Sequence, residues 1–178
     1  MNDFAKQLSS YNLLTCLLPG ATFCVLMSEL YSYPLIPDNI FAAFFLSYFV
    51  GLVISRVGSV IVEPFLITTK VVKRGPYRNF VVASRLDENL EVLLETNNVY
   101  RSMIALPICA GAFHLGTLTA DFFVLGSEAR AAIILVLMIV LFGAAYRKQM
   151  NYVSSRVSYH QEQLKEPESA PPPSIDAS

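Results

Sequence analysis

The stretches NIFAAFFLSYFVGLVIS, residues 39–55, and AAIILVLMIVLFGAAY, residues 131–146, decide the fold class of this chain. Neither contains Lys, Arg, Asp or Glu, and two further uncharged stretches cover residues 7–28 and 102–120. A helix of about 20 apolar residues crosses the hydrocarbon core of a bilayer, which is about 30 Å thick. Four such stretches predict an all-α integral membrane protein with four transmembrane helices.

The composition of the whole chain supports this class. Of its 178 residues, 54% are hydrophobic and 15% are charged, against about 25% charged residues in an average soluble domain. The net charge of −1 gives no electrostatic reason to expect nucleic-acid binding. Cys16, Cys24 and Cys109 all lie in apolar stretches and lack metal-ligand spacing, so we interpret them as packing residues. We therefore expect no metal and no cofactor.

The order of apolar and polar segments gives a domain organisation. Asn39 is a predicted N-cap, and one helix is expected from about residue 39 to 63. A cytoplasmic amphipathic helical segment should separate spans two and three, beginning near Pro76 and running on toward Arg101. The predicted segments are an N-terminus at 1–10, a transmembrane hairpin at 11–66, the helical segment at 67–101, a second hairpin at 102–146, a helical extension at 147–165 and a disordered tail at 166–178.

The distribution of Lys and Arg predicts the orientation in the membrane. The turn at 31–38 contains none, and the turn at 121–130 contains only Arg130. The bases concentrate in the segments before, between and after the two hairpins, at Lys6, Lys70, Lys73, Arg74, Arg78, Arg85, Arg101, Arg147, Lys148, Arg156 and Lys165. The positive-inside rule then places both termini and the middle segment in the cytoplasm.

Two charges interrupt the second span. Arg56 and Glu63 are seven residues apart, which is two turns of an α-helix, so we expect them on one face. Charges at membrane depth are costly and are functional candidates. They are a candidate gating or intramembrane charge pair, either lining a vestibule or pairing across subunits. Anchoring of an overlong helix at headgroup level explains the same pattern.

Small residues recur every four positions along the second span, at Ala43, Ser47, Gly51, Ser55 and Ser59. Small residues at this spacing let helix backbones approach closely in membranes. We interpret them as a helix-packing stripe, within the chain or between subunits; a pore lined by the serines is the functional alternative.

Catalytic patterns are absent from the sequence. No nucleophile elbow, zinc-protease helix, phosphate-binding loop or pair of carboxylates within one span occurs. His114 and Asp121 are seven residues apart near the outer end of span three, but a proton relay or metal site needs more partners. A hydrogen-bonded histidine explains His114 better, and we expect a protein that is not an enzyme.

Two stretches carry a resemblance: GLVISRVGSVIVEPFL at 51–66, and the segment from PYRNFV at 76–81 to ETNNVYR at 95–101. They resemble a family of small bacterial multi-pass membrane proteins, some similar to transmembrane effectors encoded beside anti-phage systems such as retrons. The resemblance covers about residues 11–146. It implies an inner-membrane protein that stays inactive until infection and then disrupts the membrane. By position it marks Arg56, Glu63, Asn97, Asn98, Tyr100 and Arg101. The last four of these, together with Arg78, form a candidate cytoplasmic regulatory surface.

Three functional hypotheses follow. The first is a homo-oligomeric membrane protein, in contact with membrane lipid, that permeabilises the inner membrane or signals across it in anti-phage defence. The second is a membrane anchor or sensor whose charged surface at 70–101 docks a soluble cytoplasmic defence partner. The third, weaker, is a subunit of a small-solute channel or transporter.

Overall fold

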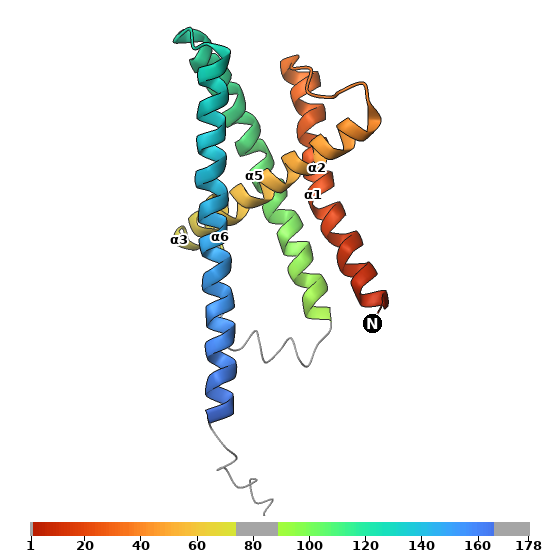
Figure 1. The fold of residues 1–178 in the computed structure, drawn as a ribbon, viewed down its shortest axis with the longest axis vertical. Helices are drawn as coiled ribbons and strands as arrows, with labels where there is room; N and C mark the ends of the chain where they lie inside the picture. The colour runs from red at the N-terminus through yellow and green to blue at the C-terminus, as the bar shows by residue number, and fades with distance from the viewer. Residues whose placement is uncertain (1, 74–88, 166–178) are drawn as a thin grey trace, which may run out of the picture. The chain divides into compact units, whose positions relative to one another are not determined.

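The computed structural model describes residues 2–73 and 89–165, and the regular structure of these residues is entirely helical. This confirms the predicted all-α class for the described part of the chain. The elements are α1 (Asn2–Tyr31), α2 (Ile40–Val57), the π-helical turn η1 (Gly58–Val62), α3 (Glu63–Thr68), α5 (Asn89–Phe122) and α6 (Ser127–Lys165). Figure 1 shows their order along the chain.

Three of the described helical stretches are long and apolar enough to cross a membrane. They are Ile40–Thr68, Val92–Phe122 and Ser127–Ser158, and a shorter apolar helix covers Thr15–Tyr31. The stretch Ile40–Thr68 extends beyond the predicted helix at 39–63, because α2, η1 and α3 follow one another without a break. The predicted helix near Pro76 and the tail at 166–178 lie outside the described residues.

Local capping explains where two of the helices begin and end. The side-chain oxygen of Asn39 accepts hydrogen bonds from the backbone N–H groups of Phe41, at 2.9 Å, and Ala42, at 3.2 Å, so the predicted N-cap of α2 is confirmed. Helix α1 ends where Ser32 adopts a φ of 55°. The N–H of Tyr33 then donates to the carbonyl of Met27 at 3.1 Å, which closes the last turn.

Helices α1, α2 and α5 pack together around a small apolar core in the compact unit that covers residues 1–145. Figure 1 shows α2, coloured orange to yellow, crossing both α1 and α5 obliquely. The core residues come from all three helices and from η1, and they are Phe23, Cys24, Met27, Ile54, Val62, Ala105, Leu106 and Ala110. The residues from Tyr146 onward, including the last five turns of α6, belong to a separate unit.

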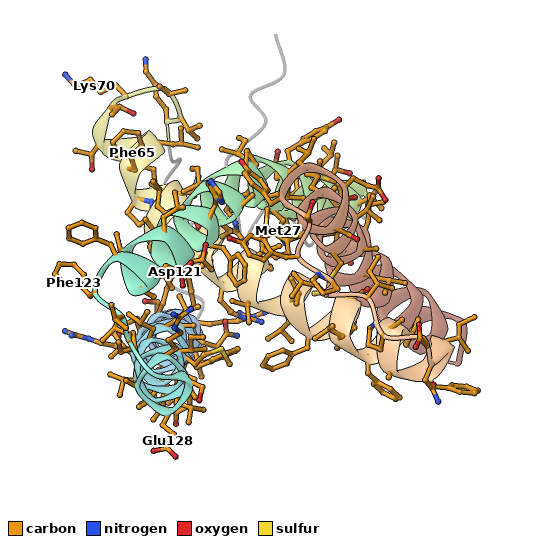
Figure 2. All side chains as sticks on the ribbon, turned by 90° about the horizontal axis from the view of Figure 1, so that it is seen from above. Met27, Phe65, Lys70, Asp121, Phe123 and Glu128 are labelled. Atoms are coloured by element: carbon orange, nitrogen blue, oxygen red, sulfur yellow. The ribbon has the colours of Figure 1, made fainter. Side chains whose placement is uncertain are left out.

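Many large apolar side chains nevertheless point outward. In Figure 2, Met27 lies among the helices, whereas Phe65 and Phe123 point away from them. Met27 is fully buried, but Phe65 and Phe123 are more than half exposed, as are most apolar side chains of α6 between Ile134 and Val140. A soluble monomer rarely exposes apolar surface on this scale. A bilayer covers such a surface with acyl chains, as the apolar stretches predict.

Candidate functional site

The helical stretch that contains α2 and α3 changes its winding at η1, where it meets α5. A Cβ atom added to Gly58 would lie 3.3 Å from both Cγ and the carbonyl oxygen of Arg101, and 3.5 Å from Cβ of Ala105. A glycine therefore lets the backbone of α5 approach this turn closely. Single π-helical turns within α-helices are rare, and they occur frequently at functional sites.

An ion pair joins α3 to α5 directly beside this turn. Nη1 of Arg101 donates to Oε2 of Glu63 at 3.0 Å. The side chains of Arg101 and Glu63 are only 22% and 20% exposed, so most of the pair is buried within the protein. Separating a pair in such an environment costs more than separating a pair at a wet surface.

The residues next to Arg101 fix its place on α5. Ser102 is fully buried, and its hydroxyl donates to the carbonyl of Asn98, one turn earlier, at 2.9 Å. Ala105, one turn later, is also fully buried. Arg101 therefore lies at the edge of the packed face of α5, and from there its guanidinium reaches Glu63.

The ion pair lies at one end of the packed helices. Arg101 precedes Phe122, the last residue of α5, by 21 positions, which is about 31 Å along an α-helix. That length equals about one hydrocarbon thickness. The other end of α5 meets the turn between α1 and α2, because Tyr33 bonds to Thr117 there. The pair is therefore suited to a position near one membrane interface.

Arg56 and Glu63 do not share an environment in this structure. Arg56 is exposed, whereas Glu63 is partly buried against α5. The physical reason is η1, which lies between them: a π-helical turn closes i→i+5 hydrogen bonds, so seven residues no longer complete two α turns. The two charges therefore lie in different environments here, and Arg101 is a described partner of Glu63. Pairing of Arg56 across subunits stays a prediction.

The predicted regulatory surface divides into different environments. Asn97 and Tyr100 are exposed on α5, while Asn98 and Arg101 are partly buried. Arg78 lies outside the described residues. Of this set, Arg101 alone is shown in an ion pair, and the resemblance had marked it without indicating a partner.

The middle of the small-residue stripe lies at the crossing of α1 and α2. A Cβ added to Gly51 would come within 1.6 Å of the carbonyl oxygen of Cys16, and one added to Gly20 within 1.7 Å of the carbonyl oxygen of Ser47. The two glycines are therefore reciprocal, since each meets the backbone of the other helix. Farther along the stripe, Ala43, Ser55 and Ser59 are partly buried.

A second cluster lies at the opposite end of α5 and joins it to the α1–α2 turn. The ring centroid of His114 lies 4.2 Å from that of Tyr31, and the Tyr33 hydroxyl lies 2.6 Å from Oγ1 of Thr117. Nδ1 of His114 is buried and has no hydrogen-bond partner among the described residues. This differs from the expected hydrogen-bonded histidine, because aromatic rings surround it here.

Asp121, the second residue of that sequence pattern, has a different partner. Its Oδ1 accepts a hydrogen bond from Nη2 of Arg130 at 2.8 Å, while Nε of Arg130 donates to the carbonyl of Leu125. The sequence did not indicate this clamp, which closes the turn between α5 and α6. His114 and Asp121 therefore belong to two separate local structures.

The described residues contain no group of three His, Cys, Asp or Glu side chains that could hold a metal ion. What the arrangement offers is a partly buried charge pair beside a backbone turn of π-helical geometry. No protein-family model, characterised protein or solved structure matches this chain significantly, so its function is argued from its own residues.

Proposed function

We propose that this chain is a non-enzymatic, homo-oligomeric membrane protein that acts as a membrane-permeabilising or signalling effector. Its four spans place both termini on the cytoplasmic side of a bacterial inner membrane. Three long apolar helices and one shorter apolar helix support insertion. The Lys and Arg residues between and after the hairpins support the orientation. The context of anti-phage defence rests on the family resemblance.

The ion pair between Glu63 and Arg101 is the observation that carries this proposal. It connects α3 to α5, and it lies beside η1, where the helix can change its winding. In the resting protein the pair keeps this end of the helices closed. A trigger that separates the two charges lets α3 move away from α5. The separated side chains of Glu63 and Arg101 then admit water and ions. Ion pairs that hold one of two conformations are a common basis of switching.

Membrane potential in cells that express the protein tests this role. Glu63→Gln and Arg101→Gln each remove one charge, and we expect either variant to depolarise the membrane without the natural trigger. The double variant Glu63→Arg with Arg101→Glu restores opposite charges and should restore the resting potential, at least in part. A voltage-sensitive dye measures the outcome in each case.

The structure supplies a matched control for these variants. Asp121 and Arg130 form an ion pair of similar length, 2.8 Å, but it is more exposed and lies in the α5–α6 turn. Asp121→Asn and Arg130→Gln should leave the potential unchanged. The proposed role of the Glu63–Arg101 pair is refuted if Glu63→Gln and Arg101→Gln keep a normal potential both with and without the trigger. It is also refuted if the variants of the Asp121–Arg130 pair change the potential as much as those of the Glu63–Arg101 pair.

A second function has one observation in its favour. Helix α6 has 39 residues, about 58 Å, which is nearly twice the thickness of the hydrocarbon core. The polar end of α6, residues 147–165, supplies a surface outside the membrane. A soluble partner can dock on this surface, as expected of an anchor or sensor. A pull-down with the intact chain, compared with a chain in which residues 147–165 of α6 are scrambled, tests this. An unchanged set of captured proteins would count against the anchor.

A further inference from the structure

The end of α6 from Tyr146 onward carries a narrow apolar stripe that the proposed gating by the Glu63–Arg101 pair does not involve. Four of its members are exposed: Tyr146 by 68%, Met150 by 43%, Val153 by 45% and Val157 by 50%. Their separations are four, three and four residues, which is the alternation of a heptad repeat. The same spacing continues in the sequence through His160 to Leu164, still within α6.

The arrangement around the helix is strongly one-sided. At 100° per residue, these six positions fall within an arc of about 80°. No Lys, Arg, Asp or Glu falls in that arc; the residues opposite it, such as Asn151, Ser155 and Glu162, are polar. An apolar seam of this width with polar flanks is typical of a coiled coil.

The period of the seam specifies what covers it. Spacing of 3.5 residues matches another helix with the same period, because both helices must supercoil together to keep their seams in contact. A lipid surface makes no such demand, and amphipathic helices that lie on membranes present a broader apolar face, usually with many bases. Here the stripe is narrow, and the bases within residues 146–164 are Arg147, Lys148 and Arg156.

We propose that residues 146–164 of α6 form a parallel coiled coil with the same segment of a second copy of this chain. This rests on the proposed function, in which several copies lie in one membrane with the same orientation. Copies inserted in that way carry their α6 segments parallel and at the same height, so identical seams meet in register. Tethering to one membrane also raises the effective concentration of the partner.

The flanking charges are compatible with such a pair. With Met150 and Val157 at the a positions, Arg156 occupies a g position, and its parallel partner at the e position of the next heptad is Gln161. The preceding pair of this kind joins Gln149 to Ser154. Self-association therefore brings no like charges together across the seam. In this register His160 occupies a d position of the sequence pattern.

Cysteine cross-linking of the full chain in membranes tests the proposal. Val153→Cys and Val157→Cys place a thiol in the seam, and Ser155→Cys places one on the opposite side of the same helix turn. After mild oxidation, we expect the seam variants to form disulfide-linked dimers about fivefold or more above both Ser155→Cys and the unsubstituted chain. The unsubstituted chain controls for its native cysteines, which lie in α1 and α5.

Three results would each overturn the proposal: Ser155→Cys forms cross-linked dimers as readily as the seam variants, the seam variants cross-link to a different protein, or no cross-link forms at all. Because this segment of α6 is exposed, charge substitutions there should leave the helix intact. Val153→Glu with Val157→Glu should lower the oligomer mass in detergent, whereas the matched pair Asn151→Glu with Ser155→Glu should not.

The outcomes separate this inference from the proposed function. If seam cross-links form but the membrane potential does not respond to Glu63→Gln or Arg101→Gln, the gating proposal fails and the coiled coil stands. If the potential responds but the seam variants behave like Ser155→Cys, the coiled coil fails and the gating proposal stands.

Discussion

Replacement of Gly51 by alanine tests the crossing of α1 and α2. The added Cβ would lie 1.6 Å from the carbonyl oxygen of Cys16, whereas real Cβ atoms essentially never approach closer than 3.0 Å. The helices must therefore separate by about 1.4 Å, the difference between these two distances. A radial gap of about 1 Å already removes a quarter to a half of the dispersion attraction between facing atoms. Met27 and Ile54, both fully buried near this crossing, would lose such contacts.

We expect Gly51→Ala to lower the free energy of unfolding by about 1–3 kcal/mol, the usual cost of overpacking a tight interior. Gly143→Ala is the matched control, because a Cβ there meets nothing within 4 Å. That variant should gain up to about 1 kcal/mol, since alanine is the better helix former. Unfolding by SDS in mixed micelles, followed by far-ultraviolet circular dichroism, measures both. Equal stability of the two variants would refute the close packing deduced for Gly51.

Three further substitutions test local features in the same unfolding assay. Asn39→Ala removes the N-cap of α2 and should cost about 0.5–2 kcal/mol, and Asn39→Asp, which keeps the cap, should not. Val124 adopts a φ of 51° in the α5–α6 turn, so Val124→Gly should stabilise the protein by about 1 kcal/mol, and a loss of stability would contradict the strained backbone. Tyr33→Phe removes the hydroxyl bonded to Thr117 and should cost about 0.5–1.5 kcal/mol, whereas in a Thr117→Val background the same change should cost little.

Features that depend on the order of nearby residues could be predicted from the sequence. The run of apolar residues after Asn39 indicated both the helix and its cap, because capping involves residues only two or three positions apart. The continuation of α6 to Lys165 was also expected, since no Gly or Pro follows Gly143 before Pro167. In both cases the deciding interactions are local.

Features that depend on how helices meet could not be predicted in the same way. The sequence marked Glu63 and Arg101 separately, but the contact joins residues 38 positions apart. The turn η1 has no recognisable sequence signature, and it lies between Arg56 and Glu63, where the α-helical periodicity assumed regular α turns. Gly58 was the available signal, because a glycine in a span often marks a close backbone approach, yet it does not say which helix approaches.

The reciprocal contact between Gly20 and Gly51 has a consequence for how the protein enters its membrane. Pro19 lies inside α1, where it removes a backbone hydrogen bond and weakens α1 as an independent helix. Helix α2 supplies the backbone surface that α1 needs, but it leaves the ribosome later. Stable insertion of the first span must therefore wait for the second, so the two are expected to mature as one hairpin during biosynthesis.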